Sequence, residues 1–442
     1  MTPLGTLSRD ELVAFRRRIE EQYGAFRARG LHLDLTRGKP APEQLDLSNP
    51  LLELPGWGNY RAADGSDCRN YFGDPAGLPE ARVLFAPLLG ATPDQVLIGD
   101  NSSLALMHDA IAYALLHGVP TPDKPGGAAP WGGGEPIAFL CPSPGYDRHF
   151  ALCEGFGIRM IPIALTGEGP DLAAVERQVA ADPAIKGIWC VPKYSNPTGE
   201  IYAPATIARL AAMKVAARDF RLFWDNAYAV HHLTETRHEI DSVLEACVRA
   251  GQPDRALVFA STSKITFAGA GLALMAASRA NLAWFLRHAG RRSIGPDKLN
   301  QLRHVRLLQD TAGIAALMDR HRRLLAPKFR AVDETFTRLL GGAGIASWSK
   351  PAGGYFVSLD VEIGSAQRVA ALATAAGIAL VPAGRTFPYG KDPHDRNLRL
   401  APSFPPAGEV ARAAEGVALA VLMAATEALL RTNDLDAAAE VA

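Results

Sequence analysis

The 442 residues include 46 basic and 46 acidic side chains, so the formal net charge is zero, and 48% of the residues are hydrophobic. This balance is typical of a soluble globular protein with a large core, and it excludes a nucleic-acid or membrane-surface partner held by bulk charge. The five cysteines are scattered and lack CxxC spacing, which indicates reduced thiols and a cytoplasmic protein.

The N-terminus predicts a capped amphipathic helix that begins near Ser8. It has no apolar segment of the kind that a signal peptide needs. No uninterrupted apolar run in the chain is long enough to span a bilayer, so we expect no membrane association.

Short apolar runs alternate with helical patterns through the middle of the chain. Strand-like runs occupy residues 94–100, 136–142, 158–165, 185–192, 220–225 and 256–261. Helical patterns follow at 103–117 and 204–219, and the Gly- and Pro-rich segment 120–136 predicts a long surface loop. The alternation predicts an α/β fold with a mostly parallel sheet and helices on both of its faces.

The pattern changes near the end of the chain, which predicts more than one domain. We expect a large domain at 59–325 and a smaller α+β domain at 326–442. Residues 1–58 are predicted to form a segment that packs with the small domain.

Polar side chains follow several of the predicted strands, at the sheet edge where ligands bind in parallel α/β folds. Asn101, Ser102 and Ser103 open a helix, so their free N–H groups suit a phosphate, although ordinary helix capping explains them equally well. Tyr146 follows the next strand and either stacks on a planar ring or simply packs.

Further strands end in Asn196, Asp225 and Lys264, with Tyr228 close behind the aspartate. Asn196 can hydrogen-bond a ligand oxygen or simply form a turn, and Asp225 can pair with a protonated ring nitrogen or cap a helix. Lys264 is the one charged residue in the run 256–278. A desolvated lysine amine is a nucleophile toward carbonyl groups, whereas a snorkelling lysine is the plainer interpretation. Together these side chains describe a pocket for pyridoxal phosphate.

The order of the motifs "SNPTG", "DNAY", "STSK" and "LRLAPS" resembles that of the fold-type I, class I/II aminotransferases. The motifs "LTRGKP", "KYSNPTG" and "STSKITFAGAG" resemble more narrowly the aspartate aminotransferase subgroup, and the likeness runs from about residue 8 to residue 425. It implies a seven-stranded sheet, pyridoxal 5'-phosphate as cofactor, and a homodimer with shared active sites.

The resemblance also implies residue roles. Lys264 would carry the cofactor as a Schiff base and then act as the base for the 1,3-proton shift. Asp225 would pair with the pyridine nitrogen, Tyr146 would stack on the ring, and Asn196 and Tyr228 would hydrogen-bond its phenolic oxygen. The implied phosphate ligands are Asn101, Ser102, Ser103, Ser261 and Ser263, together with Tyr71 from the partner subunit. The implied ligands of the substrate carboxylate are Arg399, Asn196 and the backbone near Gly38.

Two departures from the subgroup's pattern bear on this resemblance. The segment "NYFGDPAGLPE" is one residue longer than expected, which affects the placement of Tyr71. The family at large has a phosphate-binding arginine eight residues after the lysine, where this chain has Leu272. The serines and the helix N-terminus are therefore expected to hold the phosphate.

The implied reaction is transamination between L-aspartate and 2-oxoglutarate by a ping-pong cycle. A dicarboxylate needs a second cation, for which the candidates are Arg291, Arg292, Lys298 and Lys39. Other donors, or a lyase or decarboxylase reaction on the same cofactor, stay open.

Four other functions are less compatible with the sequence. A serine acylase needs S-x-x-K, which Ser261 and Lys264 supply, but the motif recurs at Ser347 and Lys350 and no K-T-G exists. A regulator on the same fold would need a DNA-binding domain, for which the N-terminus has neither room nor charge. A dinucleotide fingerprint and a metal-ligand set are also lacking, and the pair "HH" at 231–232 does not supply the latter.

Overall fold

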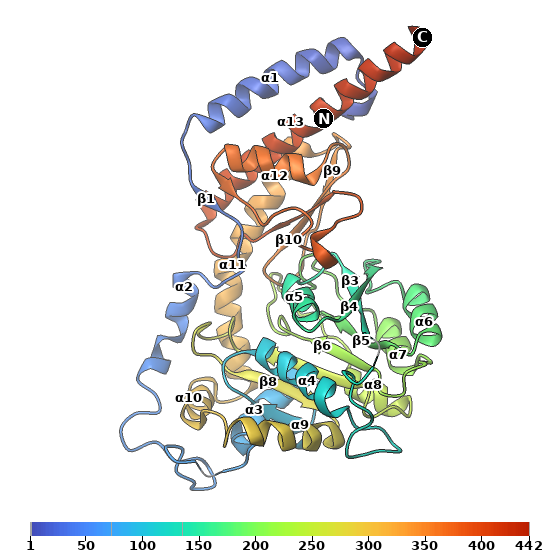
Figure 1. The fold of residues 1–442 in the computed structure, drawn as a ribbon. Helices are drawn as coiled ribbons and strands as arrows, with labels where there is room; N and C mark the ends of the chain where they lie inside the picture. The colour runs from blue at the N-terminus through green and yellow to red at the C-terminus, as the bar shows by residue number, and fades with distance from the viewer. Residues whose placement is uncertain (1, 72, 135, 442) are drawn as a thin grey trace.

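The computed structural model describes residues 2–71, 73–134 and 136–441 and divides into two lobes joined by one long helix (Figure 1). The lower lobe contains a seven-stranded sheet in the order β2-β8-β7-β6-β5-β3-β4. Its strands are β2 (Val96–Ile98), β3 (Ala138–Ser143), β4 (Arg159–Ala164), β5 (Ile185–Cys190), β6 (Arg221–Asp225), β7 (Ala256–Ser261) and β8 (Ala273–Ala277).

The sheet is mostly parallel, as the sequence predicts. Strand β8 pairs antiparallel with both β2 and β7, and the other pairings are parallel. The apolar run 256–278 is therefore not one strand, because it turns back on itself between β7 and β8. Lys264 lies in that turn.

Helices cover both faces of this sheet. One face packs against α4 (Ser103–His117), α5 (Asp147–Gly155) and α9 (Arg279–Arg292). The opposite face packs against α3 (Pro79–Phe85), α6 (Leu172–Ala181), α7 (Pro204–Ala212), α8 (Val243–Arg249) and α10 (Lys298–Leu308). Short 3-10 helices lie at η1 (Leu4–Thr6), η2 (Asp46–Leu52), η3 (Ala86–Leu89), η4 (Pro93–Gln95) and η5 (Pro388–Gly390).

Helix α4 has the predicted bounds, whereas α7 ends seven residues before the predicted 219. The early stop has a tertiary cause. The buried guanidinium of Arg255 donates to the carbonyl oxygens of Ala211 and Met213, at 2.6 and 2.8 Å. Those carbonyls lie in and just after the last turn of α7, so a side chain from a distant segment satisfies them and the chain leaves the helix.

The upper lobe is a smaller α+β unit. It comprises α1 (Arg9–Arg27), β1 (Leu33–Asp34), β9 (Ala346–Trp348), β10 (Val357–Val361), α12 (Ala366–Ala375), β11 (Ile378–Ala379), β12 (Asn397–Leu400) and α13 (Ala407–Val441). Helix α11 (Thr311–Leu340) runs between the lobes, and α2 (Pro42–Leu45) lies beside it (Figure 1). The predicted boundaries at residues 58 and 325 stay predictions.

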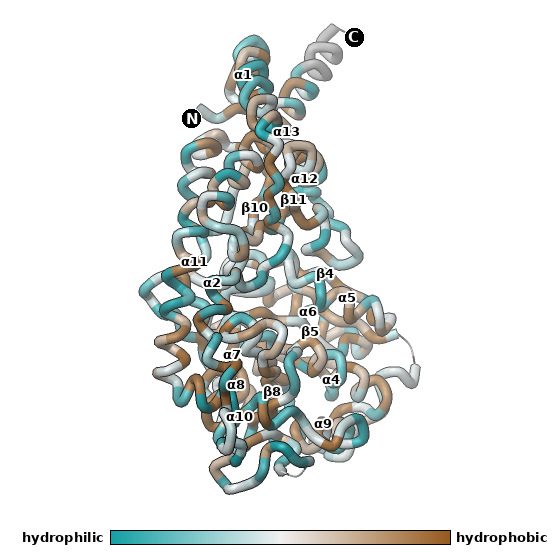
Figure 2. Tube along the Cα trace, turned by 90° about the vertical axis from the view of Figure 1, so that its left-hand side faces the viewer, coloured by the Kyte–Doolittle hydropathy of each residue, from teal (hydrophilic) through white to brown (hydrophobic). Residues whose placement is uncertain are grey.

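The predicted N-terminal helix is α1, and Ser8 and Glu11 cap it reciprocally. Its buried side chains share one apolar cluster with those of α11 and α13. The segment Ala407–Asn433 of α13 is long and apolar enough to cross a membrane, but 72% of its most apolar 18-residue stretch is buried inside the protein. Figure 2 shows hydrophobic residues along the inside of both lobes and hydrophilic ones on the outer helices. Packing therefore accounts for the apolar character of α13.

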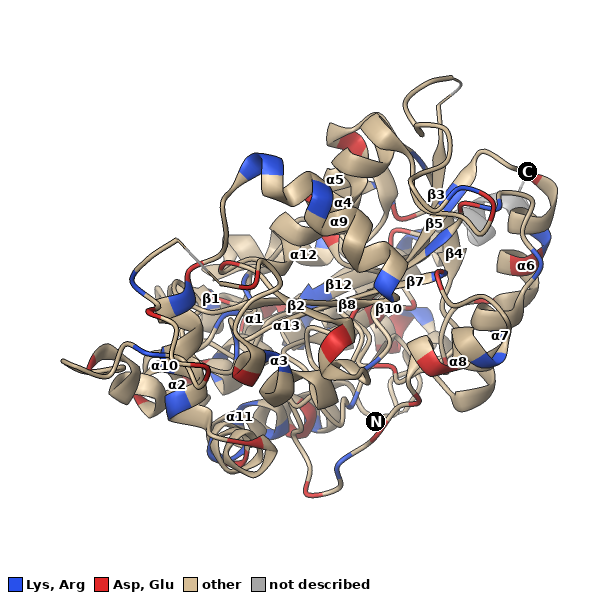
Figure 3. Cartoon of the chain, turned by 90° about the horizontal axis from the view of Figure 1, so that it is seen from below, with Lys and Arg blue, Asp and Glu red and all other residues tan. Residues whose placement is uncertain are grey.

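Basic and acidic residues are interspersed along the chain in Figure 3. Several form ion pairs at the surface, such as Arg209 with Glu176 and Arg368 with Glu427. Basic and acidic residues are thus equal in number and also evenly mixed along the chain.

Candidate active site

Five segments of the large domain meet in one cavity beyond the carboxyl ends of the strands, on the face of the sheet that α4 and α5 cover. The cavity is lined by Ser103, Leu104, Met107, Tyr146, Val191, Asn196, Asp225, Ala227, Tyr228, Ser261 and Lys264. Most of the side chains that the sequence singled out are therefore brought together. The first and the last of them, Ser103 and Lys264, lie more than 160 residues apart in the sequence.

Lys264 follows β7 and presents a half-buried side chain to the cavity. Its Nζ lies 5.1 Å from the ring centroid of Tyr228. Desolvation lowers the pKa of this ammonium, although the charge of Asp225 opposes the shift. A lysine with a lowered pKa has more of the neutral amine that attacks carbonyl carbon.

Hydrogen bonds behind Lys264 hold its turn in place. Thr262 accepts from the backbone N–H of Leu272 at 2.8 Å, and Thr266 contacts Nε2 of the buried His304 at 2.9 Å. His304 Nδ1 donates to the carbonyl oxygen of Asn300, so in the neutral ring Nε2 accepts the hydrogen bond from the Thr266 hydroxyl. The hydroxyl of Thr262 thus points into the protein, while Ser261 beside it lines the cavity.

Asp225 ends β6 and is 4% exposed. Its Oδ2 accepts a hydrogen bond of 3.0 Å from Nε2 of His149, whose ring stacks on the indole of Trp189 at 4.2 Å. Its Oδ1 is buried and has no hydrogen-bond partner among the described residues. The next helix, α8, begins at Val243 with Ser242 as its cap, so Asp225 does not cap a helix. The free oxygen is placed to accept a hydrogen bond from a ligand.

Three further polar side chains surround this carboxylate. Tyr146 packs edge-on against His149 at 4.9 Å, and burial together with the charge of Asp225 raises its pKa to about 12. Tyr228 is 4% exposed, and burial raises its pKa as well, so both phenols are neutral at physiological pH. The Oδ1 atom of Asn196 is buried without a hydrogen-bond partner in the described part of the chain. The cavity wall therefore offers neutral donors and acceptors beside one carboxylate.

The N-terminus of α4 forms the end of the cavity suited to an anion. Ser103 begins the helix and lines the cavity, and Ser102 caps it by accepting from the N–H of Ala105 at 3.2 Å. Leu272 is fully buried and brings no charge. Asn101 and Ser263 do not line the cavity, and the Asn101 amide donates to the carbonyl oxygen of Gly269 at 3.4 Å. The donors at this end are helix N–H groups and the hydroxyls of Ser103 and Ser261.

Arg399 lies in β12 of the small domain and is 8% exposed. Its guanidinium lies over the ring of Phe356 at 4.8 Å and forms an ion pair of 3.0 Å with Asp147. A Cβ at Gly38 would approach the Phe356 ring to 2.4 Å, so this position has room only for glycine. Gly38 and Arg399 therefore both pack against Phe356, but neither of these two predicted residues lines the cavity around Lys264.

The other predicted residues lie elsewhere. Tyr71 is 70% exposed and does not line the cavity, and its carbonyl oxygen accepts from Lys298 Nζ at 3.4 Å. The ammonium of Lys39 sits 3.9 Å above the ring of Phe404, and Arg292 pairs with Asp109 at 3.1 Å. Within one chain, the structure does not bring a second cation into the cavity from among the described residues.

Sequence reasoning missed several side chains that position the site. His149 could have been found, because it lies in the first turn of the helix that follows Tyr146, directly after a strand end. A second network carried no sequence signal: the Gln44 amide donates to Tyr355 at 2.9 Å and to His321 at 3.0 Å. Tyr355 and His321 in turn reach the carbonyl oxygens of Lys264 and Ile265, at 3.5 and 3.0 Å. This buried network joins the N-terminal segment, α11 and the small domain to the Lys264 turn.

The residues present fit a pyridine ring that carries a phosphate. Asp225 Oδ1 lacks a partner and suits a protonated ring nitrogen, the helix N-terminus suits a dianion, and Lys264 supplies an amine between them. No group of three or more His, Cys, Asp or Glu side chains that could hold a metal occurs in the described ranges.

Comparison with known proteins agrees with this geometry. Residues 7–433 match the family described as aspartate amino-transferase. A relative from Corynebacterium glutamicum named aspartate aminotransferase is 47% identical and covers 93% of this chain and 94% of its own length. A Mycolicibacterium smegmatis protein, provisionally named an aminotransferase, is 54% identical over 96% of this chain and 98% of its own.

Solved structures give the same result. A crystal structure of an aspartate transaminase from Corynebacterium glutamicum superposes with a TM-score of 0.93 at 46% identity, covering 97% of this chain and 99% of that chain. At 22% identity, the α-aminoadipate aminotransferase from Thermus thermophilus, in complex with N-(5'-phosphopyridoxyl)-L-leucine, shares the fold with a TM-score of 0.70 and covers 91% of this chain and 93% of that one.

Proposed function

Because the chain belongs to the aspartate aminotransferase family of pyridoxal phosphate-dependent enzymes, we propose that it moves an amino group between L-aspartate and 2-oxoglutarate in a ping-pong cycle. The products would be oxaloacetate and L-glutamate. The chain is an aminotransferase, and its cofactor is pyridoxal 5'-phosphate. The residue roles and the substrates that follow are our proposals.

One observation carries the proposal: the Lys264 amine and the unpartnered Oδ1 of Asp225 face the same cavity. When bound, the cofactor supplies an electron sink for the substrate's amino carbon. Lys264 Nζ would hold the cofactor at its carbonyl carbon, and as a free amine it would move the proton at the substrate's amino carbon. Asp225 accepts the hydrogen bond of the ring nitrogen and keeps it protonated, and His149 orients Asp225 through the 3.0 Å hydrogen bond.

The remaining cavity residues hold the ring and the phosphate. Tyr146 would pack against the ring, and Asn196 and Tyr228 would hydrogen-bond its phenolic oxygen. Ser103 and Ser261 bind the phosphate with the N–H groups that open α4, near Asn101, Ser102 and Ser263. Because Leu272 brings no guanidinium, these donors carry a larger share of the binding.

Arg399 is the proposed ligand for the substrate's α-carboxylate, with the backbone near Gly38 and the Asn196 amide beside it. The guanidinium is already oriented by Phe356 and Asp147. A side-chain carboxylate would need another cation, for which Arg291, Arg292 and Lys298 across a dimer interface, or Lys39, are the candidates. A different amino donor, or lyase or decarboxylase chemistry, is the alternative. The family match argues against a serine acylase at Ser261.

We further propose a cytoplasmic homodimer with shared active sites. Several large apolar side chains are exposed in one chain, including Trp57, Tyr71 and Ile294, and a dimer interface would cover such residues. Tyr71 would then reach the phosphate of the partner's cofactor.

The test is a panel of donors and acceptors with purified holoenzyme. Aspartate with 2-oxoglutarate should give the highest kcat/KM, and double-reciprocal plots at several fixed co-substrate concentrations should be parallel. A higher kcat/KM for alanine or an aromatic amino acid would refute the aspartate assignment, and intersecting plots would refute the ping-pong cycle.

A further inference from the structure

A second cavity, of about 450 Å³, lies on the face of the sheet opposite Lys264. Side chains alternate along β6 and just beyond its end, so Asp225 faces the catalytic cavity while Trp224 and Asn226 line the second one. The other walls come from η3, from the segment that follows Asn226, and from the first turns of α11. The two cavities share a strand but no lining residue.

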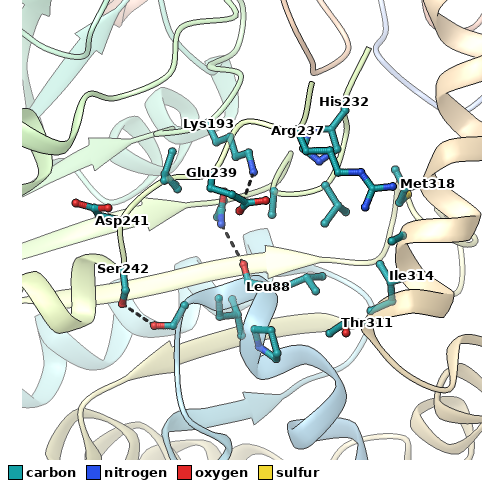
Figure 4. A pocket seen from close by; sticks show the side chains of 18 of the residues that line it. Leu88, Lys193, His232, Arg237, Glu239, Asp241, Ser242, Thr311, Ile314 and Met318 are labelled. Carbon is teal, nitrogen blue, oxygen red and sulfur yellow. Dashed lines mark hydrogen bonds and ion pairs between the residues drawn. The ribbon is translucent and has the colours of Figure 1, made fainter. Parts of the chain in front are cut away.

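The most buried charge in this second cavity is the ammonium of Lys193, whose side chain is 4% exposed. Among the described residues, the one carboxylate within 4 Å of it is Glu239, with Oε2 at 3.8 Å, which is too long for a hydrogen bond. Glu239 itself is 85% exposed, so it can swing into the solvent. Figure 4 shows Lys193 pointing toward Glu239 and into the cavity. Desolvation lowers the pKa of Lys193, and besides Glu239 its ammonium has the ring of Tyr194 at 5.7 Å. A ligand's negative charge at this position would therefore favour the charged form of the lysine.

A second, independent observation concerns Asn226, which is 7% exposed. Its Nδ2 donates to the carbonyl oxygen of Leu88 at 3.2 Å, and this fixes the orientation of the amide. Its Oδ1 is then left buried without a hydrogen-bond partner in the part of the chain that the structure describes. An acceptor in this state favours a ligand that carries an N–H or O–H donor.

Apolar side chains form one part of the lining, and polar or charged side chains form the rest. Leu88, Ile314 and Met318 face Lys193 across the cavity in Figure 4, and Trp224 and Ile240 are further apolar lining residues. Arg237 lies between Lys193 and α11, and Arg322 at the rim is already paired with Asp319 at 2.9 Å. His232 is hydrogen-bonded to Tyr194 at 2.6 Å, and burial lowers its pKa to about 4, so it is neutral at physiological pH.

We propose that this cavity is a second small-molecule site, separate from the catalytic one, for a monocarboxylate with an apolar body and one hydrogen-bond donor. The carboxylate would displace Glu239 from Lys193, the donor would bind Asn226 Oδ1, and the body would lie against Leu88, Ile314 and Met318. A single negative charge is preferred because Lys193 is the one deeply buried cation, and because Glu235, Glu239 and Asp241 line the same cavity. The volume is in the range of small-molecule sites.

Indole-3-acetate is a suitable probe, because it has one carboxylate, one N–H donor and an aromatic body. We would titrate it calorimetrically into the holoenzyme with 2-oxoglutarate present, which competes for the catalytic cavity. Binding should weaken at least tenfold in Lys193→Met and in Ile314→Trp, which fills the cavity without removing a charge. It should strengthen several-fold in Glu239→Gln, which removes the competing carboxylate.

Two controls make the result specific. Lys214→Met removes an exposed lysine outside the cavity and should leave the affinity unchanged. Arg399→Leu should also leave it unchanged, because that arginine is the proposed substrate ligand and does not line the second cavity. Melting curves would check that each variant is folded. Loss of binding in Arg399→Leu with full binding in Lys193→Met would overturn the proposal, as would the absence of binding to the unaltered holoenzyme at millimolar probe.

Discussion

The role of Asp225 gives the sharpest prediction, because the structure leaves one of its oxygens free at the cavity wall. The change is Asp225→Ala in the holoenzyme. At about 4 Å and an effective dielectric constant near 20, a carboxylate stabilises a neighbouring cation by about 4 kcal/mol. Since about 1.4 kcal/mol corresponds to one pKa unit, the ring nitrogen would lose about three units of basicity and become largely deprotonated.

We therefore expect kcat to fall about a thousandfold, while the cofactor stays bound through Lys264 and the phosphate ligands. Half-transamination with L-aspartate, followed by the change in the cofactor's absorption spectrum, measures the rate and the occupancy together. Asp171→Ala is the matched control, because Asp171 caps α6 away from the cavity and its loss should cost about 1 kcal/mol of stability but no activity. A rate for Asp225→Ala within a few-fold of the parent would show that Asp225 is structural only.

Three further predictions address other parts of the molecule. Borohydride reduction of the holoenzyme and peptide mapping should place the pyridoxyl group on Lys264, and a label on another lysine would contradict the assignment. Ser103→Ala and Ser261→Ala should each weaken cofactor retention about tenfold or more in dialysis, because Leu272 cannot replace a lost donor to the phosphate; near-normal retention would show that the helix N–H groups suffice. Burial raises the pKa of Glu200 to about 7. The folded protein therefore holds this proton more tightly than the unfolded chain does, and the free energy of unfolding falls as the pH rises from about 4.5 to 7. Above that range the loss reaches up to about 3 kcal/mol. Thermal melts of Glu200→Gln should therefore show a gain over the parent at pH 8 and little difference at pH 4.5, and an equal shift at both pH values would contradict this.

The parts of the fold that could be predicted from the sequence are those set by local patterns. Ser8 and Glu11 form a capping box that is visible three residues apart, and the bounds of α4 follow from its polar start and the glycine after His117. The strand ends could be found because parallel buried strands are apolar on both faces, so a polar residue such as Asp225 marks where each one stops.

The parts that could not be predicted depend on contacts between distant segments. The premature end of α7 needs the carbonyl contacts of Arg255, which lies more than 40 residues later in the chain. The pairing of Arg399 with Asp147 spans 252 residues, and each residue alone looks like an ordinary surface charge. In the run 256–278 the sequence predicts the strand at 256–261, which is β7, but it does not predict β8, because the small apolar residues after Lys264 carry no separate strand signal and the direction of a strand leaves no periodic signal.

The same strand end also explains how the two cavities relate. The N–H of Asn226 donates to the carbonyl oxygen of Phe259 at 2.7 Å, which fixes the end of β6 to β7, two residues before Ser261. Asp225 and Asn226 are adjacent in the chain and line different cavities, and one short loop carries both Lys193 and Asn196. The two cavities therefore share backbone segments, and any effect of the probe on kcat should disappear in Lys193→Met together with its binding.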